Sequence, residues 1–372
     1  MKIELEHAVF HEAVGRAAKA LAVRPATPIL AGMLLEAAGG ELHASAFDFE
    51  LAVRASAAAS VGEPGAVLVS GRLLTEITRV LPRLPVTLST DGTKLVLVCG
   101  AYRYTLACMP LADYPALPDS PRTLGLVEAG AFAAAAGQAA LAADRDDTLP
   151  FLTGARLEFE RARLRVVATD RYRLALRELP WQAVAEAGAA EAMVPARTLV
   201  DAARLFTPGE QIELGADEGR LGLRARGLEV TLRQLEGGFV RYAQLFPEVY
   251  AGGATVAVAP LVEAIKAIAL VAERNTPVRL EFARGRVTVG AGTGDQAVAS
   301  VTLEAEYEDD DPVSIAANPA YLLDGLGSLG APYARLRYPA KVRPVVLSGM
   351  SEPGGEVDSS YRYLFIPVRS SA

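Results

Sequence analysis

Two stretches of this chain, Pro28–Asp48 (PILAGMLLEAAGGELHASAFD) and Pro150–Asp170 (PFLTGARLEFERARLRVVATD), repeat one another with a spacing of 122 residues. Eight of the 21 aligned positions are identical. A third copy follows, because Leu157–Arg163 (LEFERAR) recurs as Leu280–Arg286 (LEFARGR) with five of seven positions identical. Self-similarity at a fixed period indicates tandem copies of one structural unit.

Each copy predicts two helices and several short strands. Helix-period apolar patterns and helix-start residues predict helices over 7–21, 71–83, 128–145, 196–206, 257–274 and 317–328. Between them, apolar and polar residues alternate as in strands, for example at Tyr102–Leu106. Turn-rich connectors at Leu111–Pro121 and Phe246–Gly253 separate the copies. We therefore expect three α+β domains over residues 1–120, 121–248 and 249–372.

Composition excludes several classes of protein. The chain has 372 residues, of which 51% are hydrophobic and 22% charged, as in ordinary globular proteins. The net charge of −7 excludes an overall basic surface for nucleic acid. No apolar run is long enough to span a membrane. Met1–Glu4 opens directly into a strand pattern, and there are only two cysteines, Cys99 and Cys108. We expect no secretory signal and a reducing, cytoplasmic location.

The domain size limits how such copies could surround DNA. Compact domains of this length are globules about 35 Å across, and three in contact leave a central gap of about 5 Å. Duplex DNA needs at least about 16 Å. Six globules in a ring leave roughly 35 Å. If the copies encircle DNA, two chains must therefore close head to tail.

The predicted helices differ in charge from the rest of the chain. They contain ten basic and eight acidic residues, whereas the remainder sums to −9. A channel lined by these helices would be mildly positive inside an acidic shell, which suits sequence-independent phosphate contact. Solvated arginines on exposed helices fit the same charges, so charge alone leaves both interpretations open.

Taken in order, several motifs resemble the bacterial DNA polymerase III beta subunit family, the sliding clamps, over the whole chain. An actinobacterial-like member is implied by the preference for Arg over Lys and the high Ala content, which are typical of GC-rich genomes. The motifs are Met1-Lys2-Ile3, Arg24–Leu30 (RPATPIL), Ala46–Phe49 (AFDF), Ala168–Leu174 (ATDRYRL) and Tyr363–Arg369 (YLFIPVR).

The resemblance implies a ring-shaped head-to-tail homodimer with antiparallel sheets outside and helices inside. It implies a processivity factor without catalysis of its own, which tethers the replicative polymerase to double-stranded DNA. Implied partners are DNA of any sequence, the polymerase catalytic subunit, the clamp loader, other polymerases and repair proteins, and a second copy of the chain. No membrane and no cofactor are expected.

The resemblance also implies a groove for an extended partner peptide with a Gln and apolar anchors. The matching residues are Leu152, Thr169, Arg171, Tyr172, Arg173, Leu174, Val240, Gln244, Leu245, Leu364, Ile366, Pro367, Val368 and Arg369. Their apolar members could form a groove, and their polar members could fix the ends of a peptide. An ordinary edge strand is the alternative for 364–368. Val240, Ala243 and Ser370 depart from the family pattern, which suggests a second, specialised clamp that escapes a groove-binding antibiotic.

Two further residue sets are predicted: the first combines the ten basic residues of the predicted helices with Arg24, which matches a family position near the bore, and the second follows from the resemblance. The DNA-facing set is Arg16, Lys19, Arg24, Arg72, Arg79, Arg83, Arg145, Arg197, Arg204, Lys266 and Arg274. The dimer-interface set is Leu106, Cys108 and Leu270, for which packing inside a domain is the alternative.

Other chemistry has weak support. His7 and His11 have the spacing of a zinc-binding pair, but no third ligand is evident, so we expect no metal. An enzyme on a repeated fold would need a nucleophile and base, and no such motif accompanies the three histidines. A clamp-like adaptor that binds peptides without being loaded on DNA remains a competing hypothesis.

Overall fold

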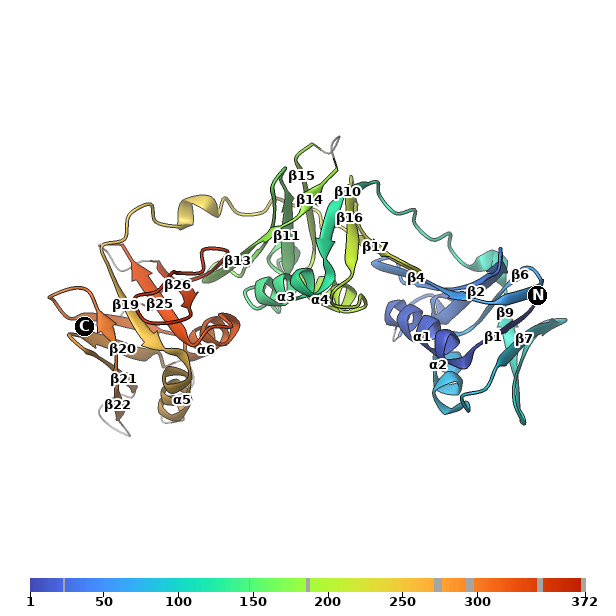
Figure 1. The fold of residues 1–372 in the computed structure, drawn as a ribbon, viewed down its shortest axis with the longest axis horizontal. Helices are drawn as coiled ribbons and strands as arrows, with labels where there is room; N and C mark the ends of the chain where they lie inside the picture. Colours follow the sequence, from blue (N-terminus) through green and yellow to red (C-terminus); the bar gives the residue numbers. More distant parts are fainter. Residues whose placement is uncertain are drawn as a thin grey trace.

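The computed structural model describes residues 1–22, 24–146, 148–184, 188–270, 276–291, 298–339 and 344–368. Three units of the same element order follow one another along an arc (Figure 1). Each unit reads strand, helix, strands, helix, strands, so the fold consists of three tandem α+β copies as the repeats predict.

In its described residues, the first unit contains α1, α2 and nine strands. Its elements are β1 (Lys2–Leu5), α1 (His7–Ala17), β2 (Gly32–Ala38), β3 (Glu41–Phe47), β4 (Leu51–Ala58), β5 (Ser60–Glu63), β6 (Gly65–Ser70), α2 (Gly71–Val80), β7 (Val86–Asp91), β8 (Lys94–Cys99) and β9 (Tyr102–Met109).

The second unit has the same order. Its elements are β10 (Thr123–Glu128), α3 (Ala129–Ala140), β11 (Gly154–Phe159), β12 (Arg163–Thr169), β13 (Arg173–Pro180), β14 (Gln182–Ala183), β15 (Ala190–Pro195), α4 (Ala196–Ala203), β16 (Gln211–Asp217), β17 (Arg220–Ala225) and β18 (Leu228–Arg233).

The third unit completes the repeat. Its elements are β19 (Gly252–Ala257), α5 (Val258–Ala269), β20 (Val278–Ala283), β21 (Arg286–Ala291), β22 (Ala299–Glu304), β23 (Glu306–Tyr307), β24 (Val313–Ala317), α6 (Pro319–Ser328), β25 (Tyr333–Tyr338), β26 (Val345–Met350) and β27 (Tyr361–Phe365).

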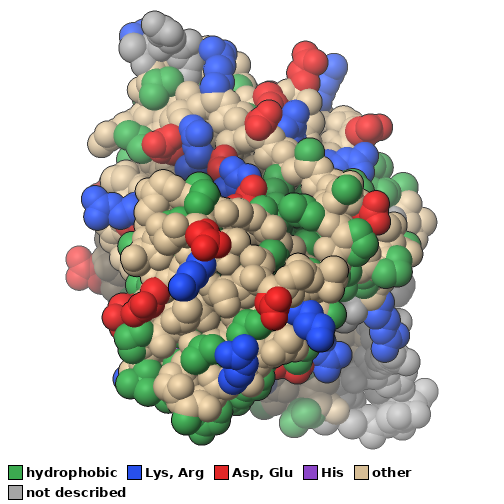
Figure 2. Space-filling model, turned by 90° about the vertical axis from the view of Figure 1, so that its right-hand side faces the viewer, with side chains coloured by type: hydrophobic (Ala, Val, Ile, Leu, Met, Phe, Trp, Pro, Cys, Tyr) green, Lys and Arg blue, Asp and Glu red, His purple; other side chains and the backbone are tan. Residues whose placement is uncertain are grey.

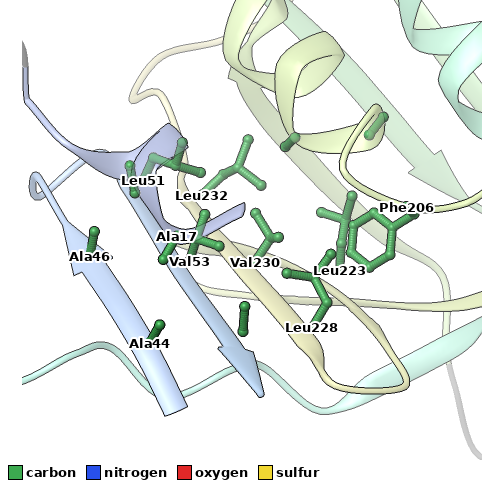
Figure 3. Close-up of a cluster of buried hydrophobic side chains, with 14 of the residues drawn as sticks. Ala17, Ala44, Ala46, Leu51, Val53, Phe206, Leu223, Leu228, Val230 and Leu232 are labelled. Carbon is green, nitrogen blue, oxygen red and sulfur yellow. The ribbon is translucent and has the colours of Figure 1, made fainter. Parts of the chain in front are cut away.

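The sheets are antiparallel and run across the boundaries between units. A 14-stranded sheet joins the first two units through β4 and β18, and a nine-stranded sheet joins the last two through β13 and β27. Apolar side chains pack across the first boundary, where Leu51 and Val53 of β4 lie opposite Leu232 and Val230 of β18 (Figure 3). Neighbouring units are therefore tied by backbone hydrogen bonds as well as by a shared core.

The helices of each unit pack together on the concave side of the arc, and the sheets form its convex side (Figure 1). All six predicted helices are present. Side chains cap the starts of α2 and α6: Ser70 Oγ accepts from Leu73 N, and Asn318 Oδ1 accepts from Ala320 N.

Several predicted helices were too long at their carboxyl ends, whereas the helix predicted over 317–328 ends at Ser328 as expected. The helix predicted over 71–83 ends at Val80, because the residue before Pro82 is extended. The helix predicted to reach residue 145 ends at Ala140, followed by a turn in which Asp144 Oδ1 accepts from Arg145 N and Asp146 N. Arg83, Arg145 and Arg204 consequently lie just beyond helices.

Candidate functional site

A groove of about 480 Å³ lies where the second and third units meet. Its walls come from the turn before β13, the linker between the units and the end of β27. The apolar lining is Leu174, Val240, Leu245, Pro344, Leu364 and Ile366. The polar lining is Thr169, Arg171, Arg173, Arg241 and Gln244. Among the described residues that line the groove, none is acidic.

A tight turn carries the first wall. Asp170 Oδ1 accepts from Tyr172 N at 3.0 Å and from Arg173 N at 2.9 Å. Thr169 Oγ1 donates to the Arg173 carbonyl and accepts from Arg171 N. These bonds hold Arg171 at φ 77°, a left-handed conformation that side chains other than glycine seldom adopt. The turn therefore presents the Arg171 side chain at a fixed position beside the groove.

Arg173 forms a buried ionic network beneath this wall. Its side chain donates to Asp170 at 2.9 Å and to Asp324 of α6 at 2.5 Å, and its guanidinium lies 4.5 Å from the ring centre of Tyr321. Only 6% of Arg173 is exposed. A guanidinium withdrawn from water requires such partners, so Arg173 joins the groove of one unit to a helix of the next.

The groove floor is apolar because two leucines face each other across the unit boundary. Leu174 of β13 pairs with Leu364 of β27, and both are buried. They belong to a small cluster with Val167, Leu176 and Val346. Such a floor suits the apolar anchors of an extended peptide.

The linker forms the opposite wall and is held by its aromatic residues. The Tyr242 hydroxyl donates to Glu158 at 2.7 Å. Burial and this hydrogen bond to a carboxylate raise the pKa of Tyr242. Phe246 lies under Arg362 and Tyr250 under Arg337, with the cations 4.5 and 4.4 Å from the ring centres. These contacts anchor the linker against the sheet beside the groove.

Nine of the predicted peptide-binding residues line this groove together: Thr169, Arg171, Arg173, Leu174, Val240, Gln244, Leu245, Leu364 and Ile366. Four others lie outside the lining. Leu152 is 1% exposed and belongs to the core, whereas Tyr172 is 58% exposed on the turn. Pro367 and Val368 follow Ile366, and Val368 N donates to the Ala316 carbonyl. Arg369 and Ser370 lie outside the described residues.

Sequence reasoning missed Arg241 and Pro344, which also line the groove. Arg241 directly follows Val240 in the linker, and a basic residue at this position could have drawn attention to it. Pro344 follows a segment without any distinctive pattern, and no signal in the sequence pointed to it.

Arg24 lies in the loop between α1 and β2. The other described DNA-facing residues lie in the helices or a few residues beyond them, and most of the set is exposed. Arg16 pairs with Glu12, Arg72 with Glu76, and Lys266 with Glu263. Arg274 is outside the described residues. His7 and His11 stack on each other and both contact Thr78, which gives them a packing role in the first unit.

The predicted interface residues lie at the two ends of the arc. Leu106 of β9 is buried in the core of the first unit, so it contributes to packing there. Cys108 is half-buried, and burial raises the pKa of its thiol. Leu270, directly after α5, is 86% exposed.

Comparison with known proteins identifies the family. Models of the DNA polymerase III beta subunit match along the chain: the N-terminal domain at residues 1–118, the central domain at 127–240 and the C-terminal domain at 243–368. The beta sliding clamp of Streptomyces coelicolor is 47% identical, with all of both chains covered. The beta sliding clamp homolog GriR of Streptomyces muensis is 40% identical over 99% of each.

Solved structures agree. The sliding clamp of Pseudomonas aeruginosa bound to griselimycin superposes with a TM-score of 0.91 at 22% identity, covering 99% of each chain. The Streptomyces relatives confirm the actinobacterial-like character expected from composition. The chain therefore belongs to the DNA polymerase III beta subunit family, the beta sliding clamps.

Proposed function

We propose that this protein acts as a sliding clamp: two copies close head to tail around duplex DNA and tether the replicative polymerase and other partners to it. The observation that carries this proposal is the match between the free sheet edges at the two ends of the chain. The mechanism is topological, because a closed ring can slide along DNA without reading its bases.

The free edges correspond to strands that pair elsewhere in the chain. By position in the repeat, β9 of the first unit is equivalent to β18 and β27, and β22 of the third is equivalent to β4 and β13. Within the described residues, β22 pairs with no strand other than β21. The pairing of β9 with β6 is limited to Cys108 and Met109. Pairing β9 with β22 of a second chain would therefore repeat the junctions already present at β4–β18 and β13–β27.

The end of the first unit offers a suitable surface. Figure 2 looks onto this end, where apolar side chains lie among interspersed acidic and basic ones. Exposed apolar residues there include Leu84 and Tyr102, and exposed Leu270 lies at the opposite end of the chain. Apolar patches of this kind, rimmed by charge, are typical of interfaces between protein subunits. We place Cys108 and Leu270 at this interface, and Leu106 behind it.

The concave side would face DNA. The basic residues of the helices, together with Arg24, offer nonspecific contacts to phosphates, while the rest of the chain is acidic overall. Loose contact of this kind permits sliding, because no contact depends on a base sequence.

The groove between the second and third units would hold partner peptides. An extended peptide could place apolar side chains on Leu174, Leu364 and Ile366 and a glutamine near Gln244 and Thr169. The polymerase, the clamp loader and repair proteins would compete for it. We further infer no intrinsic catalysis, a cytoplasmic location, and unit boundaries at 1–120, 121–248 and 249–372. In the described residues, no helix is long and apolar enough to cross a membrane.

Sedimentation equilibrium at micromolar concentration tests the closed ring. We expect a dimer, and Thr105→Pro in β9, whose N–H faces away from β8, should shift it to monomer by removing a backbone donor from the free edge. A change to proline at Tyr307 in the two-residue strand β23 is the control and should leave the dimer intact. A wild-type monomer would favour the adaptor hypothesis.

A specialised second clamp is the other candidate. Of the departures, Val240 lines the groove and Ala243 lies next to the lining residue Gln244 in the linker. The chain is 40% identical to the homolog GriR. If the groove is altered to escape a groove-binding antibiotic, griselimycin should bind weakly while a partner peptide with Gln and apolar anchors binds normally. Equal, tight binding of both ligands would remove this candidate.

A further inference from the structure

A second hollow, of about 430 Å³, lies between α3 and α4 of the middle unit. Its floor includes Gly137 and Ala140 of α3 and Val200 of α4, and its rim includes Arg145, Arg197 and Arg204. The opposite faces of the two helices are buried against the sheet, for example by Phe132 and Leu199. The hollow therefore opens on the concave side of the arc (Figure 1).

The charges around this hollow favour an anion. Among the described residues, Arg145, Arg197 and Arg204 form no ion pair, and all three are exposed. Asp144 and Asp201 also border the hollow, so its net charge is +1. Asp144 Oδ1 already accepts two backbone N–H groups of its own turn, at 2.7 and 3.1 Å. A phosphodiester carries one negative charge, which three guanidinium groups could bind.

The equivalent helix pairs of the other units lack this arrangement. Arg72 has the same place in α2 that Arg197 has in α4, but Arg72 is paired with Glu76 at 3.0 Å. Arg16 of α1 is likewise paired, with Glu12, although Arg79 of α2 stays exposed. In α6 the corresponding positions hold Ala320 and Gly327, which carry no charge. Within the described residues, unpaired arginines converge on a hollow in the middle unit.

We propose that the hollow between α3 and α4 is a phosphate site for duplex DNA, so that DNA inside the ring is held against the middle unit rather than equally by all three. This inference rests on the proposed encircling of DNA. The ligand is a backbone phosphodiester, and the two middle units of a ring would offer two such sites on opposite sides of the duplex.

Duplex binding as a function of salt tests the site. The double variant Arg197→Gln/Arg204→Gln should lower affinity about tenfold and reduce the salt slope by about one unit for each phosphate that is no longer neutralised. Arg163→Gln is the control, because this exposed arginine of β12 is paired with Glu160 and Glu178 and is not among the predicted DNA-facing residues, and its effect should stay below about twofold. An equal fall in affinity for the double variant and the control would overturn the proposal.

A second pair of variants tests the hollow itself. A Cβ added at Gly137 meets no atom within 4 Å, so a side chain there enters open space without disturbing the core. Gly137→Glu should lower DNA affinity severalfold, whereas Gly137→Gln, of the same size, should bind nearly as the wild type does. Equal binding by both would contradict an anion site.

Inorganic phosphate distinguishes the source of the ligand. If the hollow takes free phosphate instead, phosphate should raise the melting temperature of the wild type but not of the double variant, and DNA affinity should be equal in both. That result would overturn the assignment to DNA. Failure of wild-type protein to stay on closed circular DNA would instead contradict the proposed encircling, so the two failures can be told apart.

Discussion

The two junctions between units share one backbone plan but differ in what they leave open. At the first, β4 pairs with β18 so that Ala52 lies opposite Thr231. At the second, β13 pairs with β27 so that Leu174 lies opposite Leu364. The repeat spacing makes Ala52 equivalent to Leu174, so the register is the same at both places.

The linkers explain part of the difference. In the first junction, Leu117 and Pro118 cover Ala52 and Thr231, and only about 20 Å³ remains. In the second, the linker runs along the side of the groove and about 480 Å³ remains over the two leucines. Strand pairing between units therefore forms a similar sheet surface at both junctions. The residues on that surface and the contacts of the linker determine whether a groove remains above it.

The largest effect should come from the buried ion pairs, which only the second of these two junctions has among the described residues. Arg173→Met would leave Asp170 and Asp324 without their partner and should destabilise the protein by about 3–5 kcal/mol. The control is Arg233→Met at the first junction, where the pair with Glu50 is more than half exposed and the loss should be below about 1 kcal/mol. Urea unfolding measures both, and equal losses of stability would contradict the assigned role of Arg173.

Replacing a floor residue of the groove by its counterpart at the first junction should make the groove resemble that junction. Leu364→Thr copies Thr231 and should weaken binding of a fluorescent partner peptide about tenfold to a hundredfold, because an apolar anchor is left without its apolar neighbour. Thr231→Leu should not create a binding site, since Leu117 and Pro118 still cover that position. Unchanged affinity in Leu364→Thr would place the peptide elsewhere.

A smaller difference in stability is expected between the two linker tyrosines, Tyr242 and Tyr114. Tyr242→Phe removes the hydrogen bond to Glu158 and should cost about 1–2 kcal/mol. The Tyr114 hydroxyl is buried and forms no hydrogen bond of standard geometry with the described residues, so Tyr114→Phe should change stability by less than about 0.5 kcal/mol. Thermal unfolding measures the difference, and peptide affinity should fall only in Tyr242→Phe.

The smallest effect concerns pH. Burial raises the pKa of Tyr114 from 10.0 to about 12. The unfolded chain therefore ionises first, so the stability due to neutral Tyr114 is complete below pH 10 and is lost as pH rises to 12. At pH 10.5 the wild type should lose about 1 kcal/mol or less relative to Tyr114→Phe. Parallel stability curves for the two proteins between pH 9 and 11 would contradict the burial of this hydroxyl.

The three repeated units and most of their helices could be predicted from sequence, because the repeats match in their hydrophobic strands. The matches between Pro28–Asp48 and Pro150–Asp170 follow the hydrophobic strands of each copy, and the caps at Ser70 and Asn318 mark helix starts. The helix ends were predicted less well, because the turn at Asp144 and the extended residue before Pro82 depend on local hydrogen bonds and sterics that the apolar period does not show.

The candidate site was only partly accessible to sequence reasoning. The ATDRYRL and YLFIPVR motifs pointed to Thr169, Leu174 and Leu364, which the structure brings together. Arg241 was missed, because its place on the groove depends on how Tyr242 and its neighbours hold the linker. The hollow between α3 and α4 could not be foreseen either, since it depends on which arginines of three similar helix pairs find a carboxylate.

Retention on DNA of different topology tests the central claim most directly. Protein loaded onto a nicked circular plasmid by its clamp loader should remain bound through gel filtration in high salt, and cutting the plasmid once should release it. Equal retention on circular and linear DNA, or loss from both, would show that this protein holds DNA by surface contact and does not surround it.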